Sequence, residues 1–234
     1  MGKSDIWRAD FESAARRRGQ IADPEWERGS VLTPAVARSV QKFQVGESGD
    51  GAHLIAEAVA TGDHAYAAAV RLFVAEEQNH ARMLGRLLRA AGWATVHADW
   101  TDVVFVRLRR LLGLRLELMI PAVAEVIALR YYRALADGGH DPLLVDVARR
   151  ILDDEQRHVP FQCHRLRVGF ADFPRAVRFI VENGWRLTAF GVTVVVAFDH
   201  GSALAELGVG RRQFISDTWP LFGDVIGAVF GDRQ

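Results

Sequence analysis

The apolar residues of this chain recur three and four positions apart, which is the spacing of amphipathic α-helices. Thr33 followed by Pro34 predicts a helix start, because threonine can cap free backbone N–H groups and proline at the first helical position loses no hydrogen bond. We therefore predict a first helix over 34–60. Asp63 is the next candidate cap, and the alanine- and leucine-rich sequence after it predicts a second helix over 64–91.

Further segments carry the same helical pattern. One ends at the Asp-Gly-Gly sequence 137–139, and the Asp-Pro pair at 141–142 starts another that reaches about residue 168. Beyond Pro174, an apolar helix is followed by a shorter helical segment over 211–230. No β-alternating pattern of useful length occurs in the sequence, so the fold is predicted to be all-α.

Two pentapeptides in the predicted helices nearly match each other. Residues 76–80 read Glu-Glu-Gln-Asn-His and residues 154–158 read Asp-Glu-Gln-Arg-His, an offset of 78 residues. The same offset carries Glu47 onto Glu125, and in each half the lone glutamate precedes the glutamate of Glu-x-x-His by 30 residues. The chain therefore contains two copies of one helical pair. This repeat starts the third helix near Gly113, so the second and third helices should be parallel and joined by a long crossover.

The acidic residues and histidines of this repeat fall on the apolar, core-facing rows of their helices. In the second helix, for example, Glu77 and His80 interrupt a row formed by Val70, Phe73, Leu84 and Leu87. The other three helices show the same interruption. Six side chains are therefore predicted to point into one interior: Glu47, Glu77, His80, Glu125, Glu155 and His158.

Burying four ionised carboxylates together is costly unless they are paired or coordinate metal ions. Two divalent cations would neutralise the four charges, so the sequence predicts two metal ions per chain. Oxygen and imidazole donors without a thiolate suit iron or manganese, with zinc also possible, because ligand type alone does not decide among them. We expect iron first and manganese as the alternative.

These motifs resemble the ferritin-like superfamily of di-iron carboxylate proteins, in which two helices each give a glutamate and two give Glu-x-x-His. Residues 45–48 look like the first metal-binding helix of rubrerythrins, and residues 154–158 are similar to the Asp-Glu-x-Arg-His motif of bacterial multicomponent monooxygenases. The resemblance covers about 34–168 and implies a four-helix bundle with a long crossover. It also implies that Glu77 and Glu155 bridge the metals, while each remaining ligand binds one: Glu47, His80, Glu125 and His158.

Neighbouring residues are candidates for supporting the site. Because a metal-bound histidine normally donates its other ring N–H to a carboxylate, we expect Asp154 to contact His80 and Glu76 to contact His158. The alternative is that both are solvated charges. Asp50, one turn after Glu47 on the predicted helix, is either a further carboxylate at the site or an exposed residue.

Two positions on the third helix stay open. Glu117 could replace Glu125 as its ligand, although the internal repeat favours Glu125. Tyr132 should face inward, either as a core residue or as a donor or radical-capable residue beside the site.

The composition limits the classes of function. Lys and Arg together number 29, as do Asp and Glu, which gives no support for nucleic-acid binding. Cys163 is the single cysteine, so the sequence holds no four-cysteine rubredoxin module, and a reducing cytoplasm is expected. We expect neither a secretory signal nor a membrane span, since the longest uncharged apolar run, 187–198, is shorter than the ~20 residues that a span needs.

We expect three parts: an arm over 1–33 whose arginine run at 16–18 is a solvated face, the bundle over 34–169, and a helical extension of the same domain over 170–234. The extension could cover a pocket, form a substrate channel or make a homodimer contact. Gly184, Thr188 and Gly191 could let another helix approach closely, although packing within the chain is the favoured alternative.

A redox metal pair with open positions suits the activation of oxygen or peroxide, so the leading hypothesis is an oxidoreductase acting on a small molecule. The sequence does not identify its electron donor. The rivals are iron oxidation and storage as in bacterioferritins, and a non-catalytic metal-binding protein.

Overall fold

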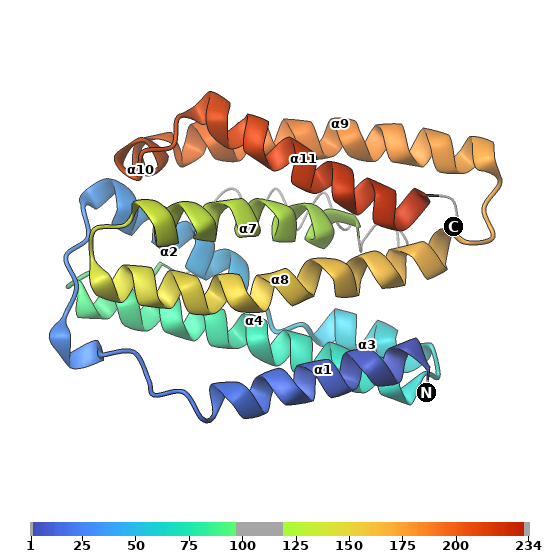
Figure 1. Ribbon diagram of the computed structural model, residues 1–234, viewed down its shortest axis with the longest axis horizontal. Coiled ribbons are helices and arrows are strands. Elements are labelled where there is room, and N and C mark those ends of the chain that lie inside the picture. The colour runs from blue at the N-terminus through green and yellow to red at the C-terminus, as the bar shows by residue number, and fades with distance from the viewer. Residues whose placement is uncertain (1, 97–118, 232–234) are drawn as a thin grey trace.

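The computed structural model describes residues 2–96 and 119–231, and the regular elements in these two ranges are all helical (Figure 1). The prediction of an all-α fold is thus confirmed. Four long helices enclose the predicted site: α2 (Pro34–Glu47), α4 (His64–Ala90), α7 (Met119–Gly138) and α8 (Pro142–Phe170).

The predicted helix caps are present at three starts. Thr33 Oγ1 accepts a hydrogen bond from the backbone N–H of Val36 at 3.2 Å. Asp63 and Asp141 cap α4 and α8 in the same way, each through a carboxylate oxygen 2.9 Å from a backbone nitrogen of the first turn. These caps satisfy N–H groups that have no partner within the helix, and so they fix where each helix begins.

The helices α4 and α7 run in the same direction, while α2 and α8 run the opposite way (Figure 1). This confirms the parallel arrangement that the internal repeat predicted for the second and third helices. The crossover itself, the predicted helix start near Gly113 and the alternative ligand Glu117 lie outside the described residues.

The predicted first helix is wrong in its length. It ends at Glu47, and a separate helix, α3 (Ala52–Ala60), follows a short loop. Gly51 in this loop has a positive φ of 62°, which favours glycine, and a Cβ there would lie 2.5 Å from Val74. The Gly-Asp-Gly sequence 49–51 therefore interrupts the helix although the apolar spacing continues across it.

The amino-terminal segment, which the sequence did not assign to a helix, forms α1 (Lys3–Arg18) and the short 3₁₀ helix η1 (Trp26–Arg28). Phe11 of α1 is fully buried, and its ring contacts those of Phe73 on α4 and Phe161 on α8. This aromatic cluster holds α1 against the bundle.

The carboxyl-terminal part forms α9 (Arg175–Asp199), α10 (Gly201–Glu206) and α11 (Arg211–Phe230). α9 packs on α7, α11 packs on α7 and α8, and α10 packs on α2 (Figure 1). Among the described residues, α9 is long and apolar enough to cross a membrane by length and composition alone. Only 22% of its most apolar stretch is buried, so most of that stretch faces outward, while Trp185, Ala189 and Ala197 pack against the protein.

Candidate metal centre

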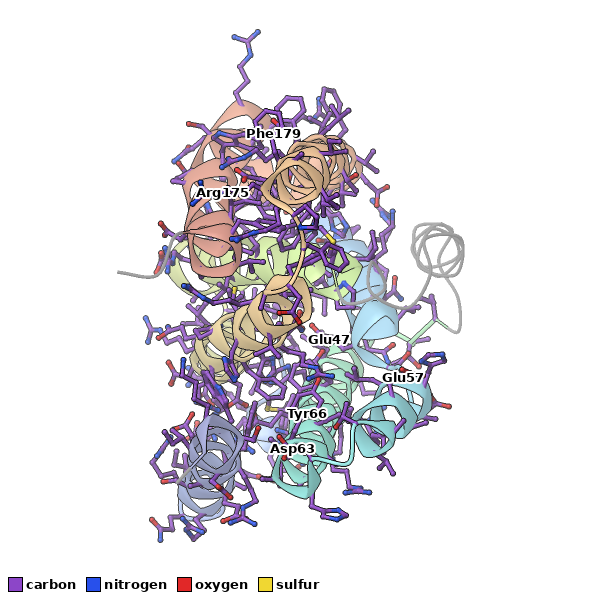
Figure 2. All side chains as sticks on the ribbon, turned by 90° about the vertical axis from the view of Figure 1, so that its right-hand side faces the viewer. Glu47, Glu57, Asp63, Tyr66, Arg175 and Phe179 are labelled. Atoms are coloured by element: carbon purple, nitrogen blue, oxygen red, sulfur yellow. The ribbon has the colours of Figure 1, made fainter. Side chains whose placement is uncertain are left out.

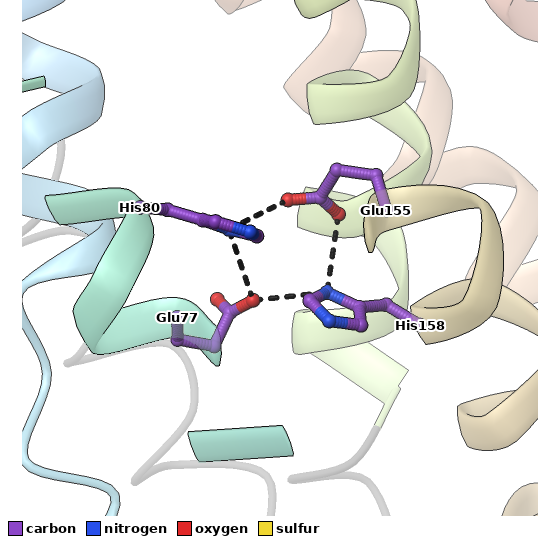
Figure 3. A group of neighbouring side chains, drawn as sticks. All are labelled: Glu77, His80, Glu155 and His158. Carbon is purple, nitrogen blue, oxygen red and sulfur yellow. Dashed lines mark ion pairs between the residues drawn. The ribbon is translucent and has the colours of Figure 1, made fainter. Parts of the chain in front are cut away.

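Four of the predicted ligands form a compact group between α4 and α8 (Figure 3). Glu77 and His80 come from α4, while Glu155 and His158 come from α8. One ligand atom from each lies within 4.8 Å of those of the other three. Each pair is three residues apart in a helix, so both side chains of a pair project from the same face.

The two lone glutamates complete the group, one beside each imidazole. Nδ1 of His80 lies 3.8 Å from Glu47 Oε2, and Nδ1 of His158 lies 3.5 Å from Glu125 Oε2. Figure 2, which looks along the helices, places Glu47 in the middle of the molecule. The structure thus brings all six predicted ligands together.

Glu77 and Glu155 face both imidazoles. Glu77 Oε1 lies 3.7 Å from His80 Nδ1 and 2.9 Å from His158 Nδ1. The two oxygens of Glu155 divide between the rings, with Oε1 3.4 Å from His80 Nδ1 and Oε2 3.4 Å from His158 Nδ1. The two central carboxylates thus lie between two sets of terminal groups.

Several polar atoms at the centre are buried without a hydrogen-bond partner among the described residues: Glu77 Oε1, both oxygens of Glu155, and Nδ1 of His80 and of His158. Buried polar atoms normally have partners, because leaving them unsatisfied costs free energy. These atoms converge on one another and are oxygen and nitrogen donors. They therefore fit divalent metal ions, which would satisfy them.

The outer nitrogens of the histidines make the crossed contacts that we predicted. His80 Nε2 lies 3.2 Å from Asp154 Oδ2, and His158 Nε2 lies 2.9 Å from Glu76 Oε2. An Nε2–H that donates to a carboxylate leaves Nδ1 as the ligand atom and fixes the orientation of the ring. Both rings are therefore held with Nδ1 toward the centre.

Two arginines neutralise these outer carboxylates, and the sequence analysis missed one of them. Arg18 Nη1 of α1 lies 2.6 Å from Glu76 Oε1 and 2.8 Å from Asp154 Oδ1, so the expectation that this arginine belongs to a solvated face is wrong. Arg157 of the second pentapeptide contacts Asp154 directly and lies 3.5 Å from Glu76. Asn79 occupies the equivalent position in the first pentapeptide. Arg18 therefore supplies from α1 the second guanidinium that the repeat lacks.

Each lone glutamate also accepts a hydrogen bond. The hydroxyl of Tyr132 donates to Glu47 Oε1 at 2.7 Å, which confirms that this tyrosine faces the site. The amide of Gln162 donates to Glu125 Oε1 at the same distance. The sequence analysis overlooked Gln162, although its place seven residues after Glu155 puts it on the same face of α8.

Asp50 does not lie on the helix that was predicted to carry it. It belongs to the loop between α2 and α3, where its Oδ1 accepts a hydrogen bond from the backbone N–H of Ala52 at 3.0 Å. It lines the cavity beside the site but is exposed. The structure therefore supports the alternative that Asp50 is an exposed residue.

Without metal, the buried site favours bound protons. Burial and the charge of Glu77 raise the pKa of Glu47 to about 8, and burial with the charges of Glu155 and Glu77 raises the pKa of Glu125 well above its usual range. Burial alone would lower the pKa of His80, but its bonds to carboxylates raise that pKa well above the ordinary value, and the same holds for His158. Metal binding must therefore displace protons from the site.

A cavity of about 350 Å³ adjoins the centre. Glu47, Glu77, Glu125 and Glu155 all contribute to its wall. Most of the other lining is apolar and includes Phe43, Leu54, Phe73, Ile120, Ile127 and Val196. At another part of the wall, His200 Nδ1 lies 2.7 Å from Ser39 Oγ, and Lys42 forms an ion pair with Asp199 at 2.6 Å. The cavity thus combines an apolar surface with polar groups.

No protein-family model matches this chain, and no curated protein matches its sequence. The function is therefore inferred from the chemistry of the site. An all-helical protein with a buried cluster of glutamates and histidines that could bind metal is compatible with a di-iron helical bundle.

Proposed function

We propose that this chain is a ferritin-like di-iron carboxylate protein that uses oxygen or peroxide to oxidise a small apolar molecule. The observation that carries the proposal is that four carboxylates line one side of an apolar cavity and converge there on the Nδ1 atoms of two buried histidines. Glu47 and His80 would hold one ion, Glu125 and His158 the other, with Glu77 and Glu155 between them. Manganese is the alternative metal.

A bound pair of redox-active ions would supply electrons and open coordination positions for oxygen or peroxide. The side chains of the protein do the rest. The glutamates balance the charge of the ions, while Glu76 and Asp154 fix the histidine rings. The apolar lining of the cavity favours an apolar substrate beside the centre and limits the water there.

Two measurements test this proposal in order. Metal analysis of the purified protein should find two ions per chain in the wild type and fewer in Glu155→Ala, with exposed Glu27→Ala as the matched control. Oxygen uptake by the reduced iron form should then depend on these ions. An iron-loaded wild-type protein that consumes neither oxygen nor peroxide would leave only the non-catalytic metal-binding reading.

A variant in the cavity distinguishes the proposed oxidation of a substrate from iron storage. Ala124 lines the cavity, so Ala124→Phe should fill part of it and slow the oxidation of bulky apolar substrates while leaving two metals bound. A storage protein of bacterioferritin type would instead accumulate many more than two irons per chain inside a large shell. Such accumulation, unaffected by Ala124→Phe, would favour storage.

A further inference from the structure

The outward face of α9 is apolar along its length. Leu187 is 74% exposed, Ile180 69% and Phe198 60%. Further exposed apolar side chains on this helix are Val177, Phe179, Phe190 and Val195, and Trp219 of α11 lies beside them with its ring 5.9 Å from that of Phe190. Figure 2 places Phe179 at the edge of the molecule, on the opposite side from Asp63 and Tyr66. We call these residues the α9 face.

Part of the α9 face has the spacing at which two helices pack together. Seven positions, which we call the seam, alternate three and four residues apart: Val177, Ile180, Gly184, Leu187, Gly191, Val194 and Phe198. This is the spacing at which one helix packs against another in a coiled coil. Because the opposite side of α9 already packs inside the chain through Trp185 and Ala197, the seam is available to another molecule.

Two glycines in the seam point to a closely packed helix as its partner. A Cβ at Gly184 or Gly191 would meet no atom within 4 Å, so packing within the chain does not require glycine at either position. Glycine in a helix interior is less favourable than alanine. Small residues at these positions would let the backbone of a second helix approach between the large side chains on either side.

We propose that the α9 face binds the same face of a second copy of this chain, forming a two-fold symmetric dimer. From the sizes of its side chains, the face exposes roughly 800 Å² of apolar surface, close to the ~800 Å² that each partner buries in an interface of standard size. A two-fold interface must be self-complementary. With the two α9 helices antiparallel, Leu187 at the middle of the seam can pack against a seam glycine of the other copy. Ile180 can then pack against the apolar residues at the opposite end of the other copy's seam.

The charges of α9 favour a second copy of the chain over a lipid surface as the partner of the α9 face. A helix lying on a membrane carries basic side chains along the edges of its apolar face, which attract anionic lipids. Two of the three arginines of α9 are instead engaged within the chain: Arg186 pairs with Glu182 at 2.9 Å, and Arg178 donates to the backbone carbonyl of Phe230 at 2.6 Å. The third, Arg175, is exposed at the first position of the helix.

Analytical ultracentrifugation at micromolar concentrations tests the proposal. The wild type should sediment with twice the mass of one chain. Leu187→Glu should raise the dimer dissociation constant by roughly 100-fold or more, because the symmetry buries two unpaired carboxylates in one interface. The control Val31→Glu changes an exposed valine outside the α9 face and should leave the dimer intact. Far-UV circular dichroism should show the same helix content in all three proteins.

A second variant tests the dimer independently if Leu187→Glu is poorly folded. Gly191→Leu has space within the chain and should strengthen the helix, yet it should weaken the dimer by blocking the close approach. A monomeric wild type, a large shell, or a dimer unaffected by both variants would overturn the proposal. Binding to a lipid surface would also overturn it: the protein would then float as a monomer with phosphatidylcholine–phosphatidylglycerol vesicles, and Gly191→Leu would strengthen that binding. These results do not depend on metal content, so they leave the proposed function to its own test.

Discussion

Arg18 joins the amino-terminal helix to the metal centre, and its removal should have a measurable cost. Its Nη1 lies 2.6 Å from Glu76 and 2.8 Å from Asp154, two carboxylates that are almost fully buried. Removing one partner of a fully buried charge pair costs about 3–5 kcal/mol. Because the Arg18 side chain is 30% exposed and Arg157 remains nearby, we expect Arg18→Ala to lower the free energy of unfolding by about 2 kcal/mol.

The two proposed metal positions should respond unequally to this change. Asp154, which orients His80, keeps its direct contact with Arg157, whereas Glu76, which orients His158, keeps Arg157 only at 3.5 Å. Loss of a residue that supports a ligand typically weakens metal binding 10- to 100-fold. We therefore expect about a tenfold loss at the position of His158 and a smaller loss at that of His80. Calorimetric titration of the metal-free protein with Mn²⁺ measures both, and urea unfolding measures stability.

The controls for Arg18→Ala come from the same helix. Arg17 is exposed and hydrogen-bonds to Ser13 one turn earlier, so Arg17→Ala should change neither quantity. Arg18→Lys keeps the charge and should recover part of the metal affinity. If Arg18→Ala binds both ions as tightly as the wild type and unfolds at the same urea concentration, the ion pairs of Arg18 contribute neither stability nor metal affinity.

Three further predictions concern the site. Glu155→Ala should lose tight binding of both ions and Glu125→Ala of one, which metal analysis after dialysis would show; two tightly bound ions in Glu155→Ala would contradict the central role of that residue. The folded pKa values of Glu47, Glu125 and both site histidines are raised above their unfolded values, so the folded metal-free protein holds more protons than the unfolded chain between about pH 5 and 8, and its melting temperature should fall as pH rises through this window. Glu155 has a lowered pKa, so its effect on stability has the opposite sign. That effect appears only as pH falls below 4.5, the ordinary pKa of a glutamate. Bound Mn²⁺ should reverse the slope, and a metal-free melting temperature that rises over this window would contradict the assignment. Tyr132→Phe removes the donor to Glu47, so chemical denaturation should show a loss of about 1 kcal/mol, and titration a weaker position beside His80; unchanged values for both would show that the bond has no net effect.

The sequence predicts most of this site because core-facing helix positions seldom hold charged residues. Glu77 and His80 interrupt an apolar row, and the second copy of the motif repeats the interruption. The burial of these side chains and their proximity to one another could therefore be inferred from the sequence alone. Arg18 could not be found this way. Its contact joins elements distant in sequence, and an arginine run at the end of an amino-terminal segment also fits a solvated surface.

The helix break after Glu47 shows a second limit of sequence patterns. Apolar spacing continues from α2 into α3, so periodicity alone joins them, whereas the backbone at Gly51 takes a left-handed conformation against Val74. The Gly-Asp-Gly sequence 49–51 is itself a local signal for a turn, and the prediction gave more weight to the apolar spacing than to this signal. The consequence is functional, because the loop at Gly51 and the side chain of Leu54 on α3 line the cavity beside the candidate centre.

The two halves of the site have diverged chemically although their ligands still match. Glu47 accepts from a tyrosine hydroxyl, while Glu125 accepts from the amide of Gln162. A phenol can give up a proton, and an amide at this position cannot do so near neutral pH. Burial and the charge of Glu47 raise the pKa of Tyr132 well above its ordinary value, so in the metal-free protein this proton stays in place. If the two positions differ in affinity or reactivity, the difference arises from these neighbours and from the unequal arginine contacts, because the ligand sets are the same.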